Sequence, residues 1–269
     1  MICARCDHYA AVPGRELCAR CAPVPAGPPP TADASVSAPV SAAPFAAPTG
    51  AWLRSPVGLG RATAALLGLV VAADLFAVWA DLAQIDVTGE LADGVTDGSV
   101  VRRADRADTL YAASGVAQTV ALLATMTVYL CWFHRVRVNA EVFDASAHSK
   151  SRGWAIGGWF CPVVNLWFPR RITLDAWDAS APAGTRPGHA LVNSWWGLWL
   201  LSLFADLVAT QQYDRAHGVG ELRAAATRMM CSDLVDIAAA LLAALVVLRL
   251  TRMQHTKALA GFAAFPVAG

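Results

Sequence analysis

Four long runs of apolar residues constrain this chain more than any other feature. They cover residues 62–84, 109–133, 190–210 and 229–250. The hydrocarbon core of a bilayer is about 30 Å thick, and a helix of about 20 apolar residues crosses it. Backbone groups within lipid must find their hydrogen bonds inside the protein, so such runs fold as helices. Only 15% of the residues are charged, against about a quarter in soluble domains. The sequence therefore predicts an all-α membrane protein, a bundle of four transmembrane helices.

A fifth apolar stretch, 153–177, is interrupted by Pro162 and by the pair Arg170 and Arg171. A proline inside a helix removes a backbone hydrogen bond and clashes with the preceding turn. Irregular backbone at membrane depth is tolerated where protein covers it or where it lines a cavity. We expect a proline-broken helix that is either re-entrant or lies in the membrane interface. A full fifth span is the alternative.

The charges of the loops predict the topology. The loop between the first two spans is acidic in balance, whereas basic residues such as Arg135 and Arg137 follow the second span, and Arg252 and Lys257 follow the last one. Lys and Arg concentrate on the cytoplasmic side of membrane proteins. Four crossings then place both termini in the cytoplasm. We expect a multi-pass protein of a bacterial cell membrane, with a membrane domain at 59–257 and a tail at 258–269.

Two different segments precede the membrane domain. Residues 23–58 are rich in Pro and Ala, a composition that favours a disordered linker. Residues 1–22 contain two CxxC pairs separated by eleven residues. Four thiolates at such spacing suit a tetrahedral zinc site, and a reducing cytosol disfavours disulfides. Iron is the lesser alternative. The predicted zinc ligands are Cys3, Cys6, Cys18 and Cys21.

The zinc ion is expected to be structural, because so short a module lacks a hydrophobic core. We expect this zinc ribbon to contact a protein partner, and the membrane domain to contact lipids. A nucleic-acid partner is not expected, because the net charge of the chain is only +1 and nucleic-acid binders carry a strong basic excess.

Several carboxyl and amide side chains lie inside the predicted spans. Each charge at a helix centre costs about 2.5 to 3.5 kcal/mol on the insertion scale. The acidic residues recur at helical spacing, so each span presents them on one face. The second span carries a polar stripe of its own: Tyr111, Ser114, Gln118, Thr125 and Tyr129. The candidate intramembrane polar site comprises Asp74, Asp81, Gln118, Asp206, Asp233 and Asp236.

Two interpretations of this site stand side by side. In the first, the carboxyl groups hold helices together through hydrogen bonds to neighbouring polar side chains. In the second, they form a pathway for protons or cations, with Asp74 deepest in the membrane. For Asp233 and Asp236, a favourable interaction with the dipole at the start of the last span is a further explanation.

The segment from Trp132 to Ser180 carries a family resemblance. Its distinctive positions are Gly157, Trp159, Pro162, Asn165, Pro169 and Arg170. The chain resembles the domain of unknown function 4328 family, membrane proteins of actinobacteria, over about 61–252. Relatives in this family also carry a cysteine-rich head and a proline-rich linker. The resemblance implies a membrane domain but brings no activity.

Four arginines close to this segment form a predicted basic collar on the cytoplasmic side. Such collars face anionic lipid headgroups, at about 1 kcal/mol per charge. The collar residues are Arg135, Arg137, Arg170 and Arg171.

No catalytic motif is present: the sequence has no GxSxG elbow, no HExxH pair and no phosphate-binding glycine loop. We therefore expect a protein that is not an enzyme, a scaffold or sensor that couples the zinc ribbon to the helical bundle. The alternative function is a small transporter or channel-like protein that uses the intramembrane aspartates. An intramembrane enzyme, the second alternative, would need a nucleophile and a base brought together by folding.

Overall fold

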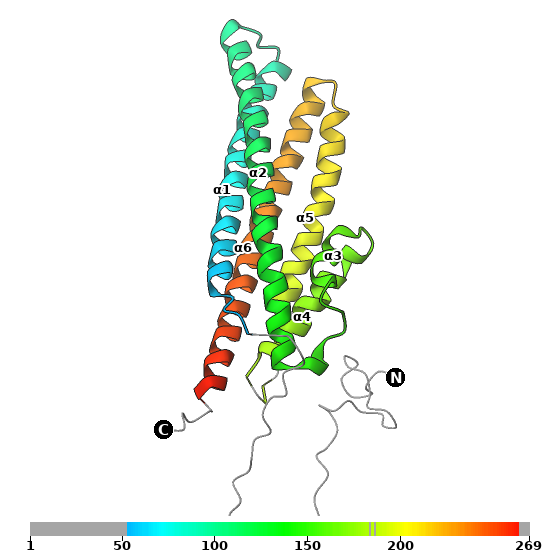
Figure 1. The fold of residues 1–269 in the computed structure, drawn as a ribbon. Helices are drawn as coiled ribbons and strands as arrows, with labels where there is room; N and C mark the ends of the chain where they lie inside the picture. The colour runs from blue at the N-terminus through cyan, green and yellow to red at the C-terminus, as the bar shows by residue number, and fades with distance from the viewer. Residues whose placement is uncertain (1–52, 183, 186, 264–269) are drawn as a thin grey trace, which may run out of the picture. The chain divides into compact units, whose positions relative to one another are not determined.

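A computed structural model of the chain describes residues 53–182, 184–185 and 187–263. All of them belong to one compact unit, Trp52–Gly269. Every element within the described residues is helical. In chain order these are α1 (Val57–Ala92), α2 (Gly98–Phe143), η1 (Ala145–Ala147), α3 (Trp154–Phe160), η2 (Val164–Leu166), α4 (Phe168–Ser180), α5 (Ala190–Asp214) and α6 (Val219–Ala263) (Figure 1).

The prediction of four membrane-crossing helices is confirmed, because α1, α2, α5 and α6 are each long and apolar enough to span a bilayer. Three of them are longer than a span requires. The 46 residues of α2 extend over about 69 Å at 1.5 Å per residue, more than twice the thickness of a hydrocarbon core. The predicted spans are thus the apolar middle parts of helices that continue beyond the membrane.

Helices α1 and α6 form the centre of the bundle. Helix α1 packs along both α6 and α2, while α5 packs along the other side of α6. Small residues allow the close approach of α1 and α6, since Ala73, Ala77 and Ala80 are buried on α1 and Ala240 and Ala243 on α6. Close packing of this kind holds helices together in lipid, where the hydrophobic effect does not.

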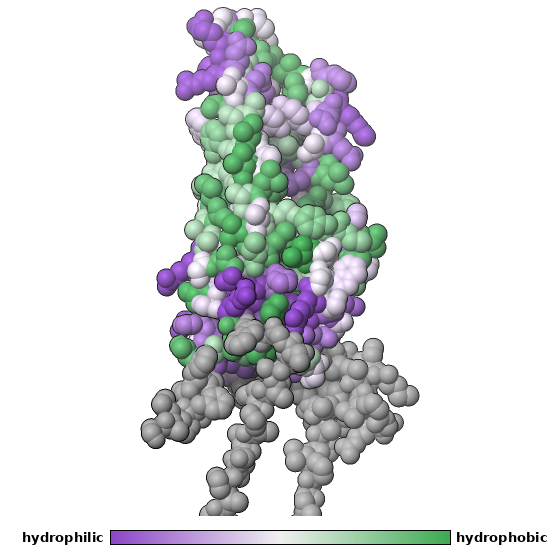
Figure 2. Space-filling model, viewed as in Figure 1, coloured by the Kyte–Doolittle hydropathy of each residue, from purple (hydrophilic) through white to green (hydrophobic). Residues whose placement is uncertain are grey.

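The outward faces of the long helices are apolar. Among the large exposed side chains are Leu75, Val116, Leu122, Phe204 and Leu245. Figure 2 shows that this apolar surface forms a belt between two hydrophilic ends. Such a distribution is expected where lipid, rather than water, surrounds the middle of the bundle.

The two ends of the bundle differ. We call the end with the connections at 93–97 and 215–218 the loop end, and the end with residues 135–153 and the C-terminal part of α6 the basic end. At the loop end, Asp97 caps α2 by accepting hydrogen bonds from the backbone N–H groups of Ser99 (2.7 Å) and Val100 (3.0 Å). A hydrogen bond from the Ser99 hydroxyl to the same oxygen, together with these two backbone bonds, lowers the pKa of the exposed Asp97 carboxyl.

The fifth apolar stretch, 153–177, is not one helix. Helix α3 ends at Phe160, and the next residue, Cys161, is extended, with φ −91° and ψ 111°. The residue before a proline is disfavoured in the helical conformation, so Pro162 accounts for the break. The chain then passes through η2 into α4, which packs against α2, α5 and α6. Neither α3 nor α4 is among the four helices long enough to cross a membrane.

The predicted zinc ribbon at 1–22 and most of the predicted linker at 23–58 lie outside the described residues. Helix α1 begins at Val57, two residues before the predicted start of the membrane domain. Helix α6 continues to Ala263, so the first part of the predicted tail, 258–269, is helical.

Candidate functional site

The aspartates of the predicted intramembrane site come together in the interior of the bundle. Asp74 and Asp81 lie on α1, Asp206 on α5, and Asp233 and Asp236 on α6. Asp74, Asp81 and Asp233 are buried, with exposed fractions of 4%, 1% and 9%. Asp74 lies close enough to Asp206, Asp233 and Asp236 to interact with them electrostatically. Aspartates from three helices therefore form one network.

Gln118 of α2 is the central link of this network. Its amide Nε2 donates one hydrogen bond to Oδ1 of Asp74 on α1 (3.1 Å) and another to Oδ1 of Asp233 on α6 (2.9 Å). One amide thus joins three helices. The second carboxylate oxygen of Asp74 is buried without a hydrogen-bond partner among the described residues.

Two pairs of carboxyl groups lie close together. Asp81 pairs with Asp233 across α1 and α6, and Asp206 pairs with Asp236 across α5 and α6. Ser232 also donates to Asp206. A carboxylate can only accept a hydrogen bond, so a bond between two carboxyl groups requires that one of them carries a proton. Two neighbouring carboxylates repel each other, so binding of one proton would stabilise each pair.

No cationic side chain neutralises these acids along the apolar segments. The runs 62–84, 109–133, 190–210 and 229–250 contain five aspartates and a single basic residue, Arg249, next to the last position. Five uncompensated negative charges in hydrocarbon would be prohibitively costly. Binding of protons removes this cost, in agreement with the paired carboxyl groups.

Polar side chains continue from the network toward the loop end. Tyr111 of α2 stacks on Tyr213 of α5, with ring centroids 4.7 Å apart, and Tyr111 lies within electrostatic reach of Asp81. One step further out, Gln84 donates to Asp108 at 3.1 Å. The polar interior thus reaches the loop end through a stacked pair of tyrosines.

Next to Asp74, on the side of the basic end, the interior is mostly apolar, and buried polar side chains such as Asn139 and Gln254 return only at the end itself. Leu67, Ala121 and Val247 are buried in this apolar part. The hydroxyl of Thr125 donates to Ala121 of its own helix at 2.7 Å, as that of Ser114 does to Tyr111 at 2.8 Å. Two members of the predicted polar stripe thus bond within α2 rather than to the aspartates.

Trp159 of the distinctive segment is the centre of an aromatic cluster. Its ring contacts Tyr129 and Phe133 of α2, and Trp196 and Trp199 of α5. Helix α3 is therefore held between α2 and α5. The indole Nε1 of Trp159 is buried without a hydrogen-bond partner among the described residues.

Other residues of the same segment shape the turn into α4. Gly158 lies against Phe168, because a Cβ at residue 158 would be 3.4 Å from that side chain. Pro169 occupies the first turn of α4, where its missing N–H is not needed. Oδ1 of Asn165 is buried without a partner among the described residues. Gly157 has no such close neighbour.

The four arginines of the predicted collar each make contacts within the protein. Arg135 donates to the Ser55 carbonyl oxygen at 3.1 Å, and Arg170 donates to Asn193 at 2.8 Å. Arg171 forms an ion pair with Asp175 at 3.3 Å. Arg137 is nearly inaccessible, with 3% of its side chain exposed.

Several polar residues of the interior were not predicted from the sequence. Gln84 and Asp108 extend the network, and Gln84 lies three residues after Asp81, so following that helical stripe one turn further would have found it. Asn139 and Gln254 form a buried amide pair at the basic end, where Asn139 donates to Gln254 at 3.1 Å. No periodic signal marks this pair, because each amide follows the end of an apolar run.

The predicted zinc ligands Cys3, Cys6, Cys18 and Cys21 lie outside the described residues. Among the described residues, no group of three or more His, Cys, Asp or Glu side chains is placed to hold a metal ion. Cys131, Cys161 and Cys231 are free thiols.

Comparison with known proteins gives one family. No curated protein and no solved structure matches the chain. The family model described as a domain of unknown function, DUF4328, matches residues 99–252. The match runs from the first turn of α2 into α6 and includes Gln118, Asp206, Asp233 and Asp236, whereas Asp74 and Asp81 of α1 precede it. More than half of the chain is covered, and the protein therefore belongs to the DUF4328 family.

Proposed function

We propose that this membrane protein binds protons in its intramembrane carboxyl network and moves them, as a small transporter or channel-like protein. The observation that carries the proposal is the link from Asp74 through Gln118 to Asp233, which joins three helices inside the apolar belt. Ionisable groups at such depth are costly and mark pathways for protons or ions in other membrane proteins.

The proton is the favoured cargo because the carboxyl groups are arranged for it. The Asp81–Asp233 and Asp206–Asp236 pairs each bring two carboxyl groups close enough to share one proton. Neighbouring carboxyl groups that share a proton can exchange it with the next group through a small movement. A chain of such groups suits the transfer of protons better than the capture of a large solute.

We propose that protons reach the carboxyl network from the loop end. The charges of the loops favour this end as the outer side of the membrane. Gln84, Asp108 and the stacked pair of Tyr111 and Tyr213 lie between the aspartates and that end. Toward the basic end, buried apolar side chains follow Asp74. The described state thus corresponds to a path that is polar from the loop end to mid-membrane and closed beyond it.

A scaffold or sensor that couples a zinc ribbon to the bundle is the second candidate. It is favoured by the same amide, because Gln118 also fastens α2 to α1 and α6. In that case the aspartates stabilise the bundle and carry no flux. Neither candidate requires catalysis, and we propose that the protein is not an enzyme.

Proton flux in liposomes separates the two candidates. The full chain is reconstituted, a pH gradient is applied, and a trapped pH-sensitive dye reports its decay. Asp74→Asn removes the ionisable group at the deep end of the network and is expected to slow the decay at least about tenfold. Asp105→Asn, at an exposed position of the loop end, is the control and should retain the wild-type rate. Folded wild-type protein with no flux above that of empty liposomes would contradict the transport proposal and favour the scaffold.

The four N-terminal cysteines are proposed to hold one structural zinc ion. Thiolates in two CxxC pairs fit zinc in number and chemistry. We expect about one zinc per chain by elemental analysis of the full-length protein. Cys6→Ser should lower this content, whereas Cys231→Ser, which alters a thiol in α6, should not. A wild-type protein free of zinc, or a content unaffected by Cys6→Ser, would contradict the proposal.

A further inference from the structure

A pocket of about 600 Å³ lies at the basic end, between the last turns of α2 and the segment that leads to α3. The side chains that line it include Arg137 and Glu141 of α2, and His148, Ser151 and Arg152 of the following segment. It is separate from the carboxyl network, which none of these residues contacts.

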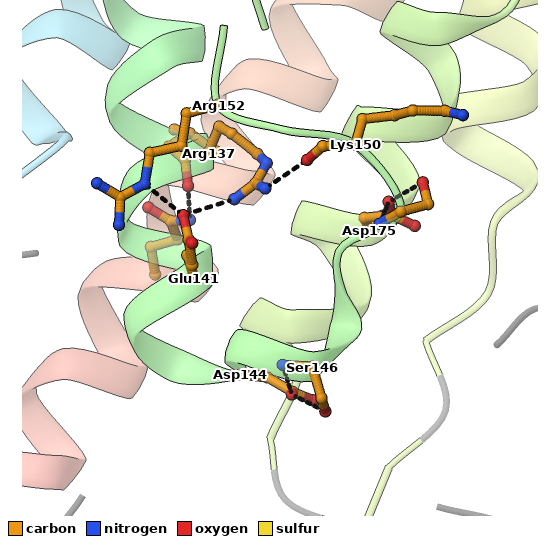
Figure 3. Close-up of polar contacts among 10 residues, drawn as sticks. Arg137, Glu141, Asp144, Ser146, Lys150, Arg152 and Asp175 are labelled. Atoms are coloured by element: carbon orange, nitrogen blue, oxygen red, sulfur yellow. Dashed lines mark hydrogen bonds and ion pairs between the residues drawn. The ribbon is translucent and has the colours of Figure 1, made fainter. Parts of the chain in front are cut away.

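Two arginines in this pocket are held in position by one acid. Nε of Arg152 (2.6 Å) and Nη1 of Arg137 (3.2 Å) both donate to Oε2 of Glu141. Nη2 of Arg137 donates to the carbonyl oxygen of Lys150 at 2.7 Å. Figure 3 shows the two guanidinium groups on either side of the Glu141 carboxylate. Both groups are therefore fixed before any ligand arrives.

The lining carries more positive than negative charge. It includes three basic side chains, those of Arg137, Lys150 and Arg152, and one acidic side chain, that of Glu141. A guanidinium has five N–H donors, and neither Nη atom of Arg152 is bonded to a described residue. Arg137 is only 3% exposed, so water does little to screen its charge. An anion would supply the missing negative charge and acceptors.

His148 also lines the pocket, next to the two arginines. Burial, together with the positive charge of Arg137, lowers the pKa of its imidazole, against smaller opposite effects of the Ala140 backbone, Asp175 and Glu141. A neutral imidazole still donates one hydrogen bond. Both ring nitrogens are inaccessible to bulk water, and the Ala140 backbone interacts with the ring, so His148 is not counted among the donors to a ligand.

We propose that this pocket binds a phosphate group through the guanidinium of Arg152, beside the buried positive charge of Arg137. Guanidinium groups bind phosphate oxygens through paired hydrogen bonds, and several donors around one anion are the usual arrangement. The proposal is independent of proton movement and goes beyond it.

The phosphate group has two sources, a free anion or a lipid headgroup. Gly153 lines the pocket, and the next residues lead into the exposed apolar side chains of Trp154, Ile156 and Phe160 on α3. A lipid whose headgroup occupied the pocket would therefore have an apolar surface beside it for its acyl chains. Binding measurements distinguish this source from free phosphate.

The test uses the full chain, freed of lipid in non-ionic detergent, with calorimetric titration of three probes. These are inorganic phosphate, a short-chain phosphatidic acid and a short-chain phosphatidylcholine. Arg152→Gln is expected to weaken the binding of phosphate or phosphatidic acid about tenfold, the effect of one charge-assisted hydrogen bond. Arg252→Gln removes the same charge from an exposed position on α6 and should leave binding unchanged.

Lys150→Gln is the control within the lining. The ammonium group of Lys150 lies over the Phe168 ring at 4.4 Å and points away from the two arginines (Figure 3), so this variant should weaken binding less than Arg152→Gln. If Arg152→Gln fails to fold, Ser151→Asp places a negative charge at an exposed position of the lining and should also abolish binding.

The outcomes decide both the site and the source. Phosphatidic acid bound at least about tenfold more tightly than inorganic phosphate identifies a lipid site, and equal affinities identify a site for free phosphate. Either result supports the proposal when Arg152→Gln is the variant that weakens binding. Failure of both anionic probes to bind would overturn it. So would equal losses in Arg152→Gln, Lys150→Gln and Arg252→Gln, because bulk charge would then explain the binding.

Discussion

At the scale of single residues, Gly60 marks a close contact between α1 and α6. A Cβ at this position would lie 2.9 Å from Cγ2 and 3.1 Å from Cβ of Thr251. Thr251 cannot easily turn away, because its hydroxyl accepts a hydrogen bond from Nε1 of Trp132 at 2.9 Å. One glycine therefore allows three helices to meet at the basic end.

Gly60→Ala tests this contact. Overpacking at a close contact costs about 1 to 3 kcal/mol, so the variant should unfold at a lower temperature than the wild type in the same detergent. Gly68→Ala is the matched control, because nothing lies within 4 Å of a Cβ at that position on the same helix. Alanine is favoured over glycine within a helix, so the control should be as stable as the wild type or slightly more so. Equal losses in the two variants would contradict the proposed contact.

Some contacts of single residues could be predicted from the sequence, and others could not. The acidic stripes of α1 and α6 could be found because their spacing follows the helical period. The contact at Gly60 could not, because it depends on which residue of another helix lies opposite. The buried pair of Asn139 and Gln254 was missed for the same reason, since its partners are 115 residues apart.

At the scale of elements, the membrane domain depends on polar links between helices that are otherwise joined by small apolar residues. Gln118 connects α2 to both α1 and α6. At the basic end, Gln254 of α6 donates to the Val136 carbonyl of α2 (2.9 Å) and to Ser180 of α4 (3.2 Å). These links fix the register of long helices that could otherwise slide.

Gln118→Ala is expected to destabilise the bundle. Hydrogen bonds between helices in a membrane contribute about 1 to 2 kcal/mol in model peptides and less in whole proteins, and this variant loses two. Thermal unfolding in detergent should therefore begin at a lower temperature. Thr119→Ala is the control, because the exposed hydroxyl of Thr119 bonds only to Gly115 of its own helix. If both variants unfolded at the wild-type temperature, the two hydrogen bonds of Gln118 would not stabilise the bundle.

Helix number could be predicted better than helix length. Apolar runs define the spans, because lipid requires about 20 apolar residues. The ends of α1, α2 and α6 lie in polar sequence, where the helix continues by packing on its neighbour: Val87 of α1 and Val100 of α2 form a small core at the loop end. The break in the fifth stretch was predictable from Pro162, whereas the burial of α4 was not.

At the scale of the whole molecule, the bundle joins an acidic interior to a basic end. The proposed orientation follows from the loop charges, with the basic end in the cytoplasm. Four crossings bring the C-terminus to the same side as Arg135 and Arg137. The proposed direction of proton entry depends on this orientation.

A reporter fused after Gly269 tests the orientation in cells. A green fluorescent protein should be fluorescent at this position, because it folds in the cytoplasm. An alkaline phosphatase should be inactive there, because it is active only outside the cytoplasm. The phosphatase fused within the loop at 93–97 is the matched control and should be active. Phosphatase activity at the C-terminus would place that terminus outside the cytoplasm and would contradict the proposed topology.

Infrared spectroscopy of the reconstituted protein near neutral pH reports directly whether the carboxyl network carries protons. Protonated carboxylic acids absorb in a carbonyl band that carboxylates lack and that shifts in D₂O. We predict that the wild type shows this band and that Asp233→Asn reduces it, whereas Asp105→Asn leaves it unchanged. A wild-type spectrum with carboxylate bands alone would contradict the account, because the paired acids could not then share protons.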